Sequence, residues 1–249
     1  MHSQSALQSY ISNANLLCNA LSGSLKVQCT TLGENMKIKI CGITNLDDAI
    51  AAVNAGADML GYNFYPKSKR YIAMKECVEI QDGLVERGMD VVSVGVFVNA
   101  SYETIITTLE VCALNLVQLH GDESPELLEA LGEWAFKAIR PQSEEEALRA
   151  LEKYSQEDSA PALLVDAYHP SEYGGSGTVG DWSLARALAA QAPILLAGGL
   201  TPDNVGEAVR QVRPWGVDVA SGVEASPVEK DAAKMKTFVQ AVRSATESG

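Results

Sequence analysis

Residues 194–223 read ILLAGGLTPDNVGEAVRQVRPWGVDVASGV and contain one complete unit of the pattern that decides the fold. An apolar run at 194–197 ends in two glycines, a helical stretch follows at 203–212, and a second apolar run at 217–220 ends in Ser221 and Gly222. Continuous apolar runs are typical of parallel strands that are covered on both faces. The stretch therefore predicts a strand, a helix and a second strand parallel to the first.

The same pattern extends back to Met36. Short runs predict strands at 37–41, 59–64, 91–98, 116–119, 136–139, 163–166, 194–197 and 217–220. Helical periodicity predicts helices that include 47–54, 74–86, 102–111, 125–131, 144–154, 182–190, 203–212 and 231–242. Strand–helix alternation indicates a parallel sheet with right-handed crossovers. Eight such units fit a closed (β/α)8 TIM barrel, which usually takes about 250 residues.

An open, doubly wound α/β sheet is the structural alternative. Such sheets usually have five or six strands and often carry a G-x-G-x-x-G turn after the first. The first turn here reads Cys41-Gly42-Ile43-Thr44, which lacks that pattern. We therefore expect a single barrel domain over residues 36–249.

Composition limits the classes of partner. The 249 residues are 47% hydrophobic and 20% charged, with a net charge of −13. This acidity argues against binding to nucleic acid or to an anionic membrane, both of which require many basic residues. A small anionic ligand remains compatible, because local donors can outweigh a screened global charge.

The five cysteines are irregularly spaced and form neither C-x-x-C pairs nor zinc-type clusters with histidine. We expect free thiols, mostly buried, in a reduced cytoplasmic chain without a metal site.

Residues 1–35 differ from the rest of the chain. They are rich in Ser, Asn, Gln and Leu, contain no acid before Glu34 and have Lys26 as their one strong base. The segment lacks the basic start and continuous apolar centre of a signal peptide. We predict a disordered or loosely helical extension. A plastid transit peptide is the alternative, although such peptides are rich in Arg, which is absent here.

In barrels of this kind, active sites lie at the carboxyl ends of the strands. Cys41 ends the first predicted strand and Asp166 ends the sixth, so both would face the same mouth. An Asp that follows apolar strand residues is partly withdrawn from water, which suits a proton donor, and a Cys can act as a base when its neighbours favour the thiolate. Together they predict acid–base chemistry. Alone, Cys41 could be a small core residue and Asp166 a loop cap.

Other strand ends suggest ligand contacts. Gly198 and Gly199 follow the seventh strand, and Ser221 and Gly222 follow the eighth. Glycine lets the backbone approach a ligand closely, and these two loops often bind phosphate in such barrels, so we expect a phosphate site rather than plain turns.

Three further features point to the same mouth. Arg70 lies in the basic stretch after the second strand and could bind a carboxylate. His120 ends the fourth strand, where it could contact ligand or cap the strand. The glycine-rich residues 167–181 could form a lid or an exposed loop.

Five motifs in register resemble the phosphoribosylanthranilate isomerase family from about residue 36 to the end. They are KICGIT at 39–44, QLHGDE at 118–123, GGSG at 174–177 with Asp181-Trp182, LAGGL at 196–200 and VDVASGVE at 217–224. Within the motifs, Ser176, Thr178 and Gly180 replace the usual Thr, Lys and Phe of the glycine-rich loop, and Lys69 replaces a common Pro before Arg70.

The resemblance implies an aldose–ketose isomerase of tryptophan biosynthesis that uses no cofactor. Its substrate would be N-(5'-phosphoribosyl)anthranilate and its reaction an Amadori rearrangement. Asp166 would be the general acid and Cys41 the general base. Arg70 would hold the anthranilate carboxylate, and the two glycine loops would hold the phosphate. The family includes monomers and dimers, and we expect a monomer.

Two alternatives stay open from the residues. One is another phosphosugar barrel enzyme, such as the related isomerase of histidine synthesis, which would use Asp where Cys41 stands. Indole-glycerol-phosphate synthase would use lysines at strand ends, and those ends carry none here. The other alternative is a non-catalytic barrel that binds a phosphate ligand, against which the presence of both Cys41 and Asp166 argues.

Overall fold

The computed structural model describes residues 36–155, 161–166 and 182–247, all within one compact unit, Asn35–Gly249. The predicted extension at 1–35 and the predicted lid at 167–181 lie outside the described residues. The strands are β1 (Lys37–Cys41), β2 (Met59–Asn63), β3 (Val92–Phe97), β4 (Leu116–Leu119), β5 (Ala135–Ile139), β6 (Leu163–Asp166), β7 (Ile194–Ala197) and β8 (Gly216–Val219). They form one closed barrel in chain order.

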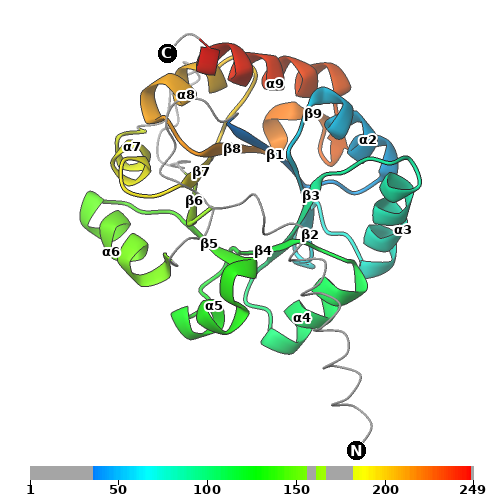
Figure 1. The fold of residues 1–249 in the computed structure, drawn as a ribbon, viewed down its shortest axis with the longest axis horizontal. Helices are drawn as coiled ribbons and strands as arrows, with labels where there is room; N and C mark the ends of the chain where they lie inside the picture. The colour runs from blue at the N-terminus through cyan, green and yellow to red at the C-terminus, as the bar shows by residue number, and fades with distance from the viewer. Residues whose placement is uncertain (1–35, 156–160, 167–181, 248–249) are drawn as a thin grey trace, which may run out of the picture. The chain divides into compact units, whose positions relative to one another are not determined.

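Helices surround the barrel in Figure 1 and alternate with its strands. They are α2 (Leu46–Ala55), α3 (Met74–Val85), α4 (Tyr102–Val111), α5 (Pro125–Leu131), α6 (Glu144–Tyr154), α7 (Ser183–Ala189), α8 (Val205–Val212) and α9 (Ala232–Glu247). Closure is direct, because β1 pairs in parallel with β8 as well as with β2. The predicted TIM barrel is confirmed.

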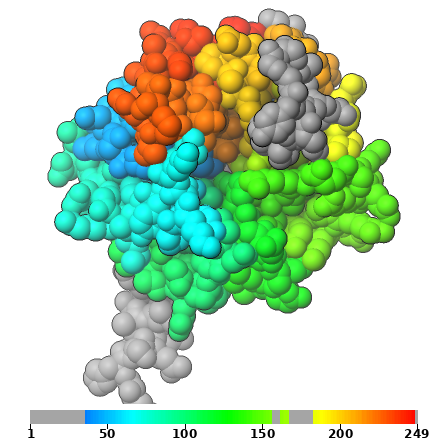
Figure 2. All heavy atoms as spheres, turned by 180° about the vertical axis from the view of Figure 1, so that it is seen from behind, coloured from blue at the N-terminus to red at the C-terminus, as the bar shows by residue number. Residues whose placement is uncertain are grey.

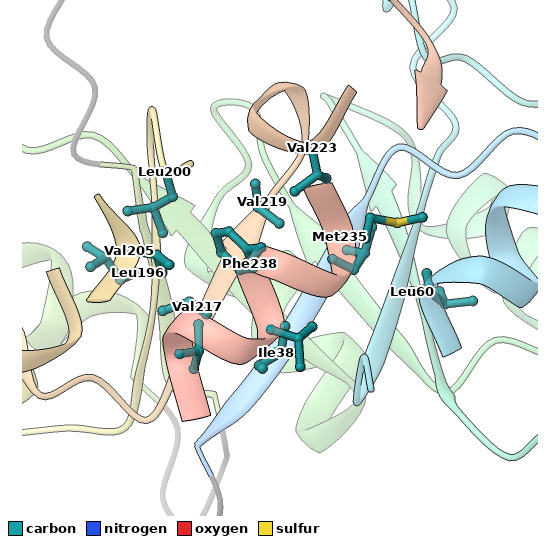
Figure 3. Close-up of a cluster of buried hydrophobic side chains, with 14 of the residues drawn as sticks. Ile38, Leu60, Leu196, Leu200, Val205, Val217, Val219, Val223, Met235 and Phe238 are labelled. Carbon is teal, nitrogen blue, oxygen red and sulfur yellow. The ribbon is translucent and has the colours of Figure 1, made fainter. Parts of the chain in front are cut away.

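Side-chain alternation along each strand separates two cores. Ile38 and Ile40 of β1 face the helices, and Figure 3 shows Ile38 and Val217 near Met235 and Phe238 of α9. A second cluster comes from the other face of the strands and fills the barrel. Its buried members are Met59, Val94, Phe136, Ala138, Leu164, Leu195 and Ala197. Because these apolar side chains fill the barrel interior, side chains that could react with a ligand lie at positions nearer the carboxyl ends of the strands.

Local signals explain most helix starts. The Ser101 hydroxyl accepts a hydrogen bond from the backbone N–H of Thr104, which caps α4, and Asn45 caps α2 through Asp48 in the same way. Ser124 occupies the N-cap position of α5 before Pro125, but its side chain makes no capping bond. The predicted start of α8 at 203 is wrong. The helix begins at Val205, because residues 202–204 form a turn first.

The segment after β8 contains structure that the apolar pattern did not predict. A 3₁₀ turn, η2 (Ser221–Val223), leads into a short antiparallel pair, β9 (Glu224–Ser226) and β10 (Glu229–Lys230). A second 3₁₀ turn, η1 (Gly132–Trp134), joins α5 to β5. The β9–β10 hairpin matters for function, because it brings Glu224 and Lys230 to the barrel mouth.

Candidate active site

Strand β1 delivers two polar side chains to the barrel interior. Lys39 and Cys41 lie two residues apart and therefore share the inward face. Cys41 is half-buried at the carboxyl end, whereas Lys39 is fully buried one layer below. Gly61 of β2 makes room for both, because a Cβ added there would lie 2.7 Å from Cys41 Sγ and 3.1 Å from Lys39 Nζ.

The Lys39 ammonium connects three strands. Its Nζ donates to Oδ1 of Asp218 on β8 at 2.9 Å and to Oε1 of Gln118 on β4 at 2.9 Å. Its positive charge also acts on the thiol of Cys41. Burial by itself would lower the pKa of Lys39, but the charges of Asp218 and Cys41 outweigh that effect, so its pKa is raised. Lys39 is therefore a buried ammonium.

The environment of Cys41 contains opposing influences. Burial raises the pKa of the Cys41 thiol most strongly, and the negative charge of Asp218 acts in the same direction. The ammonium groups of Lys39 and Lys230 and the hydrogen bond from Lys39 lower that pKa. The net pKa stays above the ordinary value, so in the unliganded protein burial outweighs the nearby positive charges.

A continuous row of polar contacts leads from this cluster to Asp166. Beyond Lys39, Gln118 Nε2 lies 2.7 Å from Nδ1 of His120, and His120 Nε2 lies 2.9 Å from a terminal guanidinium nitrogen of Arg140. Arg140 Nε then donates to Oδ2 of Asp166 at 2.7 Å. Cys41 and Asp166 thus face one interior through side chains of β1, β4, β5 and β6.

The two contacts of His120 make opposite demands on its ring. Gln118 turns its carbonyl oxygen toward the Lys39 ammonium, so its amide N–H faces Nδ1 of the imidazole, whereas the Arg140 guanidinium, which has only N–H donors, faces Nε2. A neutral ring accepts at one nitrogen only, so one of these two contacts is not a hydrogen bond. Burial lowers the pKa of His120, and the charge of Arg140 lowers it further, which favours the neutral ring.

A second pair holds the loop that carries His120. The Glu123 carboxylate accepts hydrogen bonds from the backbone N–H groups of Gly121 and Asn99. Lys137 of β5 pairs with Glu123 at 3.0 Å and also donates to the carbonyl of Gly121 at 2.6 Å. Both charged side chains are buried. The His-Gly-Asp-Glu stretch is thus a turn that is tied to the barrel by a buried ion pair.

Arg70 lies on the opposite flank of Cys41. Its stem runs over Gly42, where an added Cβ would lie 2.3 Å from Arg70 Cδ. Its guanidinium is held by Glu224 through two hydrogen bonds, and Lys230 Nζ also contacts Glu224 at 3.1 Å. Figure 2 shows the segment after β8, in orange, beside the segment after β2, in cyan. The hairpin therefore sets the position of Arg70.

The glycine loops after β7 and β8 pack against each other. Gly198 and Gly199 have φ angles of 96° and 65°, which side chains rarely adopt. A Cβ on Gly222 would lie 1.9 Å from the carbonyl oxygen of Leu200. Asn204 pins the first loop by accepting from the Thr201 N–H and donating to the Gly199 carbonyl. A residue with a Cβ would be strained at Gly198 and Gly199 and would collide with Leu200 at Gly222.

The structure thus brings Cys41, His120 and Asp166 to one polar interior, with Arg70 beside Cys41. The glycines and Ser221 lie at the carboxyl ends of β7 and β8, on the same face of the barrel. Several partners escaped sequence reasoning. They are Lys39, Gln118, Lys137, Arg140, Asp218, Glu224 and Lys230. For Lys39, Gln118, Lys137 and Asp218, the available signal was a polar residue inside an otherwise apolar strand, as in KIKIC, LVQL, FKAI and VDVA.

Among the described residues, no group of three or more His, Cys, Asp and Glu side chains is arranged to hold a metal ion. None of the helices in the same part of the chain is long and apolar enough to cross a membrane. Cys77 and Cys112 are buried free thiols, as predicted for cysteines outside the site.

Comparison with known proteins adds independent information. Residues 38–241 match the family model described as N-(5'phosphoribosyl)anthranilate (PRA) isomerase. An N-(5'-phosphoribosyl)anthranilate isomerase from Myxococcus xanthus is 46% identical over 211 residues, which cover 84% of this chain and 97% of that protein.

Two solved structures are similar along almost their whole length. The phosphoribosyl anthranilate isomerase of Thermotoga maritima is 42% identical, with a TM-score of 0.74 over 84% of this chain and 99% of that one. A phosphoribosyl anthranilate isomerase in complex with reduced 1-(o-carboxyphenylamino)-1-deoxyribulose 5-phosphate is 40% identical, with a TM-score of 0.72 and the same coverage. By family model, sequence and fold, this chain belongs to the N-(5'-phosphoribosyl)anthranilate isomerase family.

Proposed function

We propose that this chain converts N-(5'-phosphoribosyl)anthranilate to 1-(2-carboxyphenylamino)-1-deoxyribulose 5-phosphate. The observation that carries the assignment of roles is the row of contacts that joins Cys41 to Asp166 across one interior. Family membership supplies the reaction class, since the relatives are isomerases of this name.

Asp166 begins the reaction as general acid. Its protonated carboxyl group donates to the ribose ring oxygen, the bond between that oxygen and C1 breaks, and the nitrogen lone pair forms a protonated Schiff base at C1. Asp166 suits this role because it is half-buried at the end of β6 while its partner Arg140 remains largely exposed. The pair can therefore separate when a substrate enters.

Cys41 completes the rearrangement as general base. Its thiolate removes the proton from C2, the electron pair forms a double bond between C1 and C2, and the nitrogen recovers its lone pair. The resulting enolamine loses its hydroxyl proton and gains a proton at C1, which gives the ketone. Oxidation at C2 balances reduction at C1, so the proposed reaction needs no external cofactor.

Binding is assigned to the flanks of the same mouth. Arg70 holds the anthranilate carboxylate, for which Glu224 leaves part of the guanidinium edge available. His120 presents its imidazole to the substrate. The loops with Gly198, Gly199, Ser221 and Gly222 hold the phosphate, a role supported by the close backbone packing of Gly222 on Leu200.

The test is conversion of purified substrate by the full chain, followed by chromatography of the product. Cys41→Ala and Asp166→Ala should each reduce kcat by at least about 10²-fold, since acid–base groups contribute that much. Cys77→Ala removes a buried thiol outside the site and should keep kcat. Activity of either site variant near the normal level would overturn the roles, and binding without conversion by the unmodified chain would indicate a ligand-binding barrel.

We also propose that the chain acts as a monomer. Its large exposed apolar side chains include Val85, Val111 and Trp134, which belong to different elements of the described barrel. Exposed apolar side chains that stand singly are ordinary on monomeric proteins. Light scattering at micromolar concentration should give the mass of one chain, and a doubled mass would contradict this assignment.

A further inference from the structure

Lys39 has no place in the proposed reaction sequence, although its charge lowers the pKa of the proposed base more than the charge of any other cation does. Its side chain is fully buried, and buried ammonium groups are costly unless each of their protons is used. An ammonium group has three N–H donors. The Asp218 carboxylate and the Gln118 carbonyl accept two of them, and the third is left for the Cys41 sulfur, which lies over the same Gly61 backbone as the ammonium nitrogen.

The neighbouring strand fits this contact closely. Gly61 presents bare backbone to both the sulfur and the ammonium nitrogen, and any larger residue there would collide with Cys41 Sγ. Strand register supports the same placement, since Lys39 pairs with Asp218 across the closure of the barrel and Cys41 pairs with Gly61. The contact is thus built from three adjacent strands.

Four charged groups interact with Cys41. Lys39 and Asp218 come from β1 and β8, Lys230 comes from β10, and Arg70 comes from the loop after β2. Lys230 and Arg70 share the carboxylate of Glu224, which offsets part of their charge. Among the cations, Lys39 lowers the pKa of Cys41 most strongly and lies on the same strand, two residues away on the same face.

We propose that Lys39 is a positioning residue that favours the thiolate form of Cys41 and directs its sulfur into the barrel mouth. This rests on the proposed function only in taking Cys41 as the base. The thiol proton passes to solvent, because Lys39 is already an ammonium held by Asp218. The third N–H of Lys39 then bonds to sulfur, and a charged acceptor strengthens that bond.

A purely structural role is the competing explanation. Lys39 would then serve only to neutralise the buried Asp218 carboxylate, and its loss would damage the fold. The two roles separate in a charge-balanced double variant, Lys39→Met with Asp218→Asn, which leaves neither charge unpaired. If this double variant does not fold, Lys39→Gln with Asp218→Asn is the polar equivalent, because a glutamine at position 39 retains hydrogen bonding to Gln118.

The readout is the rate at which iodoacetamide alkylates Cys41 as a function of pH, followed by mass spectrometry of its peptide in the full chain. In the double variants we expect the midpoint to move up by about one pH unit or more, which is a tenfold loss of thiolate at neutral pH. The kcat should fall by a similar factor and recover at alkaline pH, with KM nearly unchanged. Alkylation of the buried Cys77 reports any unfolding.

The single variant Asp218→Asn should shift the alkylation midpoint of Cys41 in the opposite direction. It removes the carboxylate that competes for Lys39, so the alkylation midpoint should move below that of the unmodified chain. An alkylation midpoint that stays unchanged in the double variants would overturn the proposal. This outcome differs from failure of the proposed function, which would show as full activity in Cys41→Ala.

Discussion

Arg70 and Glu224 form a two-point ion pair that ties the loop after β2 to the hairpin after β8. Arg70 Nε donates to Oε1 at 2.5 Å, and a terminal nitrogen donates to Oε2 at 2.8 Å. The two residues are 154 positions apart in the chain. The proposed carboxylate clamp therefore depends on a partner that the sequence places far away.

Glu224→Gln should weaken substrate binding more than catalysis. The amide can accept from Arg70 through only one oxygen, so the guanidinium loses its fixed orientation. A hydrogen bond to a charged group is worth about 1.5–3 kcal/mol, which corresponds to a rise in KM of roughly tenfold or more. Steady-state kinetics would measure it, with the exposed Glu229→Gln as control. An unchanged KM would show that Glu224 does not position Arg70.

Glu224 should also make stability depend on pH. Burial tends to raise the pKa of its carboxyl, but the hydrogen bonds from Arg70 and Lys230 and their charges outweigh burial, and the pKa lies below the ordinary 4.5. Ionised Glu224 therefore stabilises the fold at neutral pH, and this contribution fades as pH falls below 4.5 through the lower folded value. In urea unfolding, the difference between Glu224→Gln and the unmodified chain should shrink across that range. A difference that stays constant would contradict the expected linkage.

The buried pair of Glu123 and Lys137 should be expensive to break on one side. Lys137→Met leaves a carboxylate without its cation beneath the His120 loop, and such changes cost about 3–5 kcal/mol. Lys137→Met with Glu123→Gln should recover part of this loss in urea unfolding. The exposed pair Arg149 and Glu145 is the matched control, where removal costs only about 0.3–0.5 kcal/mol. Equal costs at the two sites would show that the buried pair has no special role.

Gly222→Ala should disrupt the proposed phosphate site. The new Cβ would meet the Leu200 carbonyl at 1.9 Å, so one of the two loops has to move. We expect KM to rise at least tenfold and stability to fall by about 1–3 kcal/mol. Gly206→Ala is the control in α8, where the nearest atom to the Cβ is 3.5 Å away. That change should stabilise by up to about 1 kcal/mol. A normal KM in Gly222→Ala would show that these loops do not bind the phosphate.

The barrel could be predicted because each of its strands has a local sequence signal. Short, almost wholly apolar runs such as ILLA and LLVD are typical of strands that are covered on both faces, and the helices between them have clear periodicity. Cys41, His120 and Asp166 could be located for the same reason, since each stands where such a run ends. Their roles stay predictions, as does the domain boundary at residue 36.

The partners of these residues could not be predicted, because they depend on register around a closed sheet. Lys39 and Asp218 are 179 positions apart and meet only when β1 pairs with β8. Glu224 and Lys230 come from a hairpin whose strands are three and two residues long, too short for a periodic signal. Arg140 directly follows β5, but its contacts with His120 and Asp166 depend on side-chain directions that the sequence does not give.

Strand β1 has only five residues, and its alternate positions face different environments. Ile38 and Ile40 anchor the strand to the helices, whereas Lys39 and Cys41 point inward. Insertion or deletion of one residue would exchange these two sets. Lys39 and Cys41 would then point at the apolar side chains of the helices. Directed evolution could therefore retune the chemistry of β1 by point substitution, but changes in its length would abolish folding and turnover together.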